Sequence, residues 1–60
     1  MNVYDIWNYL VEYDVATEGE IQLVVDINGL SEKTMNDIIY AKTGYNNIEQ
    51  LQDEIEAGEY

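Results

Sequence analysis

The sequence predicts an all-α fold, a small bundle of three to four short helices that includes a helix-turn-helix-like pair. Apolar side chains recur at three- and four-residue spacing, residues suited to helix caps precede these runs, and glycines follow several of them. A chain of 60 residues has room for one domain. We therefore expect a single acidic helical domain over residues 1–60, with helices at about 2–13, 18–28, 32–43 and 47–57.

Composition favours a folded chain over a disordered one. The net charge of −11 is high for this length, and high charge combined with low hydrophobicity is typical of disorder. However, 47% of the residues are hydrophobic and the sequence contains no proline. We therefore expect the chain to fold, alone or as a dimer.

The first helix is expected over residues 2–13. On a helical wheel its polar arc holds Asp5, Asn8, Tyr9 and Glu12. The apolar arc holds Val3, Tyr4, Ile6, Trp7, Leu10, Val11 and Tyr13. Asp14 would fall inside the apolar arc, so the helix should end near Tyr13, and Tyr9 should be exposed.

The second helix is expected over residues 18–28. Thr17 and Glu20 have the spacing of a capping box, in which each side chain binds a free backbone N–H at the helix start. The apolar run contains Ile21, Val24, Val25 and Ile27. Asn28-Gly29 predicts a left-handed stop.

A strand is the alternative for this segment. Ile21, Leu23, Val25 and Ile27 occupy alternate positions, as in a strand, and Asn-Gly is a hairpin turn signal. Residues 30–34 have no alternation that would form the returning strand. The helix is therefore favoured.

Two further helices complete the predicted bundle. Ser31 should cap the third helix, which Gly44 should end in a left-handed conformation, with a buried stripe of Met35, Ile38, Ile39 and Ala41. Asn46 or Asn47 should cap the fourth helix. Its narrow stripe of Ile48, Leu51 and Ile55 predicts a position at the edge of the core.

Residues 21–40 resemble a helix-turn-helix. Gly29 takes the turn position, and the apolar positions are filled by Val24, Leu30, Met35 and Ile38. Val25 and Asn28 depart from the usual pattern. The resemblance implies that the second helix of the pair would face bases with Glu32, Lys33, Asn36, Asp37 and Tyr40. Two lysines and no arginine cannot supply phosphate affinity, so we expect no direct nucleic-acid binding.

The sequence lacks the residues that most enzyme active sites and cofactor sites require. The absence of Cys and His excludes thiol nucleophiles, Ser-His catalysis and the usual zinc sites. A calcium loop starting at Asp26 fails because Ser31 stands at the position that requires glycine. We expect no cofactor, no metal site and no enzymatic activity.

The carboxylates predict a binding surface, because they lie on the polar faces of all four expected helices with little compensating charge. With two tyrosines as anchors, the candidate partner-binding residues are Asp5, Tyr9, Glu12, Glu18, Asp26, Glu32, Asp37, Tyr40, Glu49, Asp53 and Glu56. The expected function is non-enzymatic occupation of a basic protein surface, with nucleic-acid mimicry as its most specific form. The alternative is an assembly module that forms a homodimer through apolar faces widened by Tyr4, Val11 and Leu23.

Three segments resemble short acidic proteins of phages and mobile elements of Gram-positive bacteria. They are residues 17–24, 36–40 and 43–45. This resemblance implies a small inhibitor or adaptor that acts on a host protein. No apolar run is long enough for a membrane span, and the N-terminus lacks the basic start of a signal peptide, so we expect a cytoplasmic protein.

Overall fold

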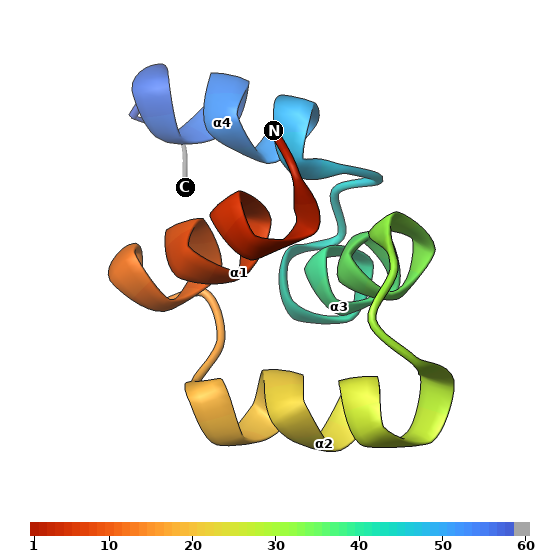
Figure 1. Cartoon of the computed structure of the whole chain (residues 1–60). Helices are drawn as coiled ribbons and strands as arrows, with labels where there is room; N and C mark the ends of the chain where they lie inside the picture. Colours follow the sequence, from red (N-terminus) through yellow and green to blue (C-terminus); the bar gives the residue numbers. More distant parts are fainter. Residues whose placement is uncertain (59–60) are drawn as a thin grey trace.

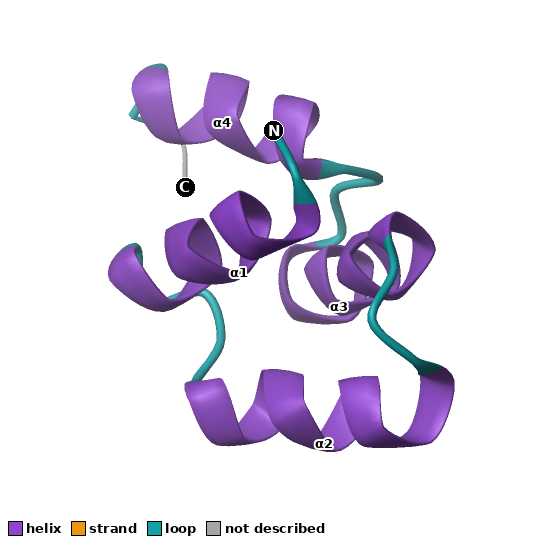
Figure 2. Ribbon diagram, in the orientation of Figure 1, coloured by secondary structure: helices purple, strands orange, loops and turns teal. Residues whose placement is uncertain are grey.

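A computed structural model describes residues 1–58, whose regular structure consists of four helices. These are α1 (Val3–Glu12), α2 (Glu18–Asn28), α3 (Glu32–Thr43) and α4 (Ile48–Glu56), as Figures 1 and 2 show. The predicted bounds differ from these by at most one residue, which confirms the all-α bundle. α3 contacts each of the other three helices, so it joins the bundle together.

The helix starts are fixed by side-chain caps. Thr17 and Glu20 form the predicted capping box, with both hydrogen bonds at 3.1 Å. Asn2 and Asp5 form a second box that the sequence analysis did not identify. Ser31 and Asn47 cap α3 and α4. Each cap typically contributes about 1 kcal/mol, and together they explain why short helices begin at these positions.

The helix ends follow the sequence with one correction. Gly44 is left-handed, with φ 84° and ψ −4°, as predicted. Gly29 ends α2 with a positive φ of 88°, so the predicted stop is confirmed, but its ψ of 155° is extended and differs from the left-handed helical conformation that was expected. Glycine adopts this conformation without steric cost, and it leads into the three-residue connection to α3.

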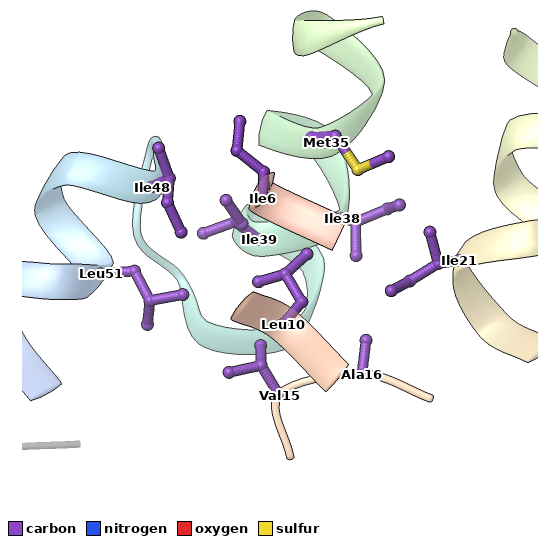
Figure 3. Packing of buried hydrophobic residues seen from close by; sticks show 10 residues of the cluster. All are labelled: Ile6, Leu10, Val15, Ala16, Ile21, Met35, Ile38, Ile39, Ile48 and Leu51. Carbon is purple, nitrogen blue, oxygen red and sulfur yellow. The ribbon is translucent and has the colours of Figure 1, made fainter. Parts of the chain in front are cut away.

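The core lies where α1, α3 and α4 meet the start of α2. Ten side chains form it, drawn in Figure 3: Ile6, Leu10, Val15, Ala16, Ile21, Met35, Ile38, Ile39, Ile48 and Leu51. Val15 and Ala16 belong to the connection between α1 and α2, and their backbone N–H groups donate to the Leu10 carbonyl at 2.9 and 3.3 Å. The connection is thus part of the core.

Several side chains lie elsewhere than predicted. Ala41 was expected in the buried stripe of α3 but is exposed, because it lies at the margin of that stripe in the last turn. The buried stripe includes Thr34 instead, whose hydroxyl donates to the Gly29 carbonyl at 2.7 Å. Tyr4, expected on the apolar arc of α1, is 63% exposed. None of these four helices is long and apolar enough to cross a membrane.

Candidate protein-binding surface

Every carboxylate predicted to bind a partner is exposed. They are Asp5, Glu12, Glu18, Asp26, Glu32, Asp37, Glu49, Asp53 and Glu56. Four of them, Asp5, Glu18, Glu32 and Glu49, lie in the first turn of a helix. A negative charge there interacts favourably with the helix dipole. These four positions therefore have a structural explanation that requires no partner.

The two lysines of the chain are both held by carboxylates. Lys33 lies 3.3 Å from Asp37 in an exposed pair along α3. Lys42 lies 2.6 Å from Glu20 and links α3 to α2. The hydrogen bond from Lys42, followed by that from the Thr17 backbone N–H, lowers the pKa of Glu20. The remaining carboxylates of residues 1–58 therefore have no lysine partner.

Glu12 and Glu56 occupy a different kind of position, because they are the last residues of α1 and α4. The C-terminal ends of these two helices lie on the same side of the bundle (Figure 1). The charges of both glutamates act on Tyr9, whose pKa is raised mainly by burial and further by Tyr13, Glu56 and Glu12. The Tyr9 and Tyr13 rings are 4.4 Å apart between centroids, at an interplanar angle of 32°.

We call Tyr9, Glu12, Tyr13 and Glu56 the tyrosine–glutamate cluster. The C-terminal end of a helix carries a partial negative charge, so a carboxylate there is unfavourable. The last turns of α1 and α4 contain no basic residue that would offset it. A Lys or Arg side chain from outside would pair with these carboxylates and lie against the tyrosine rings. The cluster therefore has the chemistry of a binding site for a cationic side chain.

Three of the predicted site residues, namely Tyr9, Glu12 and Glu56, belong to the last turns of α1 and α4, whose C-terminal ends lie on the same side of the bundle (Figure 1). It corrects the prediction for Tyr9, which was expected to be exposed but is half-buried against the core. A helical wheel of α1 represents one helix, so it does not include the contacts with the rest of the bundle that bury the side of α1 that carries Tyr9. Tyr13, which the wheel placed on the apolar arc, is 46% exposed and belongs to the cluster.

Other predicted residues lie apart from the cluster. Tyr40 is 62% exposed on α3, as predicted. Asp26 accepts a hydrogen bond from the Gln22 side chain at 2.8 Å within α2. Asp53 is exposed on α4, one turn before Glu56. These residues extend the acidic surface without adding a second tyrosine pair.

Residues 1–58 form no enclosed site for a small molecule or a metal ion. Tyr4, Trp7 and Asn8 line an open hollow of about 280 Å³ on α1, slightly below the ~300 Å³ at which small-molecule pockets typically begin. No group of three or more acidic side chains in the described residues is arranged to hold a metal ion. Comparison with protein-family models, curated proteins and solved structures gives no match to this chain.

Proposed function

We propose that this chain is a non-enzymatic binding protein that occupies a basic surface of another protein, with the tyrosine–glutamate cluster as its central contact. The observation that supports this most directly is the position of Glu12 and Glu56 beside Tyr9 at two helix C-termini. This arrangement lowers the stability of the free chain, because the helix dipoles and the like charges both oppose it. A cationic partner would remove both costs.

Nucleic-acid mimicry is the most specific form of this proposal. The exposed carboxylates would stand in for phosphates and block a nuclease, repressor or polymerase. The net charge of −11 supports it, since carboxylates replace the dense negative charge that such proteins bind. The resemblance to phage and mobile-element proteins favours an inhibitor or adaptor. Such a protein would act in the bacterial cytoplasm.

Affinity capture from a bacterial lysate tests the proposal. The immobilised chain should retain proteins that elute at moderate salt and are displaced by excess duplex DNA, because charge pairs dominate such contacts. The variant Glu12→Gln/Glu56→Gln should retain less of the same proteins. The matched control is Glu18→Gln/Glu49→Gln, which removes two charges from first turns.

The outcomes separate mimicry from the wider proposal. Retention that withstands both high salt and excess DNA would exclude mimicry. Equal losses in the two double variants would exclude the cluster as the central contact, since both variants have the same net charge.

A homodimeric assembly module is the second candidate, and one observation favours it. Leu23 and Ile27 are 62% and 73% exposed on α2. Sedimentation over a range of concentrations distinguishes the two functions. A tight dimer that retains no basic protein would favour assembly, whereas a monomer that binds basic proteins would favour the first proposal.

A further inference from the structure

α2 is apolar on two opposite faces. Ile21 points into the core and is completely buried, whereas Leu23 and Ile27 are 62% and 73% exposed. Leu23 and Ile27 are four residues apart and therefore lie on one side of the helix. In Figure 1, α2 lies at the border of the bundle, with one side toward α1 and the other outward. We call Leu23 and Ile27 the outer face of α2.

Apolar residues on two opposite sides of a helix are expected where both sides are covered. The described residues cover only the inner side of α2. The outer face also explains the strand-like alternation in this segment. Alternate residues of a helix fall on opposite sides, and both sides of α2 are apolar: Ile21 and Val25 lie on the inner side, Leu23 and Ile27 on the outer. A stripe at this spacing is what a second helix uses as its anchor positions.

Both edges of the outer face carry carboxylates. With about 100° per residue, Glu20 and Asp26 each lie roughly 60° from Leu23, on opposite sides. Glu20 forms an ion pair with Lys42. Asp26, within the described residues, only accepts a hydrogen bond from the neutral side-chain amide of Gln22. An apolar stripe between acidic edges is complementary to an apolar stripe between basic edges.

A second copy of the chain does not have that complement. In a two-fold symmetric antiparallel contact each edge meets its own copy, so Asp26 would face Asp26. In a parallel contact the Asp26 edge would face the Glu20 edge. Both arrangements place carboxylates together, in two chains that each carry a net charge of −11. Charge therefore disfavours self-association through this face.

We propose that the outer face of α2 docks an amphipathic helix of another protein, whose apolar stripe is flanked by Lys or Arg. The inference rests on the proposed function in that the partner is basic. It adds a second contact, apolar at its centre, to the charge-based contact of the tyrosine–glutamate cluster. Binding through this face depends on Leu23 and Ile27 and responds less steeply to salt than binding through carboxylates alone.

The test uses a synthetic helical peptide of about 18 residues, or five turns, with a leucine stripe flanked by lysines. A control peptide has the same composition, with its leucines distributed around the helix. Fluorescence anisotropy with the full chain measures both affinities. The first peptide should bind more tightly, because only it can match apolar centre to apolar centre.

The variant Leu23→Gln/Ile27→Gln should weaken binding of the striped peptide by about tenfold or more. Both residues are exposed and glutamine is a good helix former, so the fold should persist, which circular dichroism checks. Tyr4→Gln is the matched control, since Tyr4 is 63% exposed on a different helix, and it should leave binding unchanged. Asp26→Asn should weaken binding two- to threefold and reduce its dependence on salt.

Three results would overturn the proposal. They are equal affinity for the striped and control peptides, unchanged affinity in the Leu23→Gln/Ile27→Gln variant, and a wild-type dimer that this variant converts to a monomer. The last result would assign the outer face to a second copy. The Glu12→Gln/Glu56→Gln variant reports on the cluster alone, so undiminished lysate capture by this variant would contradict the proposed central contact. Tighter binding of the striped peptide would still support the outer face.

Discussion

The carboxylate of Glu20 lies 2.6 Å from Nζ of Lys42 and thereby joins the first turn of α2 to the last turn of α3. The other oxygen of the same carboxylate accepts the backbone N–H of Thr17 at 3.1 Å and completes the capping box. One side chain thus starts a helix and fastens it to its neighbour. This double use accounts for the lowered pKa of Glu20.

Replacing Glu20 should reduce stability in a pH-dependent way. Glu20→Gln keeps an acceptor for the cap but removes the charge that binds Lys42, so it should be less stable than Glu18→Gln at neutral pH. Because the pKa of Glu20 is below its ordinary value of 4.5 in the folded state, its contribution is present above that value and is lost as pH falls through the folded pKa. Urea unfolding at neutral and acidic pH should show the difference between the variants disappear in acid. A difference that persists in acid would contradict the role of the charge.

The same truncation should have very different effects at Leu10 and Leu23. Leu10 is completely buried, and Leu10→Ala should cost about 2–5 kcal/mol. A domain of this size has a total stability of roughly 3–9 kcal/mol, so the variant should be largely or partly unfolded. Leu23 is 62% exposed, and Leu23→Ala should change stability by about 0.5 kcal/mol or less. Thermal unfolding followed by circular dichroism compares the stability of the two variants. Equal losses of stability would contradict the assignment of Leu10 to the core.

Tyr9 should titrate above the ordinary tyrosine pKa of 10.0. Burial raises its pKa above 10.0, and Tyr13, Glu56 and Glu12 raise it further. Glu56→Gln should shift the pKa of Tyr9 downward, whereas Glu49→Gln, at the other end of α4, should not. Absorbance of tyrosinate during alkaline titration measures the shift. Because the folded pKa is raised, the stabilising contribution of Tyr9 is full below the unfolded pKa and is lost as pH rises through the folded value.

Two glycine substitutions should change stability in opposite directions. Gly44 has φ 84°, so Gly44→Ala should destabilise the chain by about 1–2 kcal/mol. Gly19 lies inside α2, and an added Cβ would meet only the Thr17 hydroxyl oxygen, at 4.0 Å. Gly19→Ala should therefore stabilise by about 0.4–1 kcal/mol. Denaturant midpoints give both values, and a stabilising Gly44→Ala would contradict the left-handed end of α3.

Removing the cluster carboxylates should make the free chain more stable. Glu12 and Glu56 oppose the helix dipoles, so Glu12→Gln/Glu56→Gln should gain about 0.3–1 kcal/mol per charge at low salt. The gain should shrink as salt screens the charges. Melting temperatures over a salt series provide the measurement. A loss of stability would indicate that these carboxylates support the fold, which would weaken the case for a partner at this position.

The helices could be predicted because their signals are local. Thr17, Ser31 and Asn47 cap the helices that follow them through hydrogen bonds no more than three residues away. Gly44 ends α3 through its own backbone angles. Such features depend on neighbours along the chain, which the sequence presents directly.

The burial of individual side chains depends on other helices and was harder to predict. Tyr9 was expected to be exposed because the wheel contains only α1, and packing in the bundle half-buries it. Val15 and Ala16 fall between helices, where no periodic pattern marks them as core. For the candidate site, the sequence identified Glu12 and Glu56 but not their proximity, because that depends on the parallel directions of α1 and α4 (Figure 1).

The connection between α1 and α2 has a consequence for how this chain moves. Val15 and Ala16 are 3% and 4% exposed, and both of their N–H groups are bound by the Leu10 carbonyl. Straightening this segment would pull both side chains out of the core and break both hydrogen bonds, so it cannot serve as the hinge that exchange of α1 between two chains requires. Domain-swapped dimers through α1 are therefore disfavoured. Amide hydrogen exchange of α1 and α2 should accordingly follow a single cooperative opening.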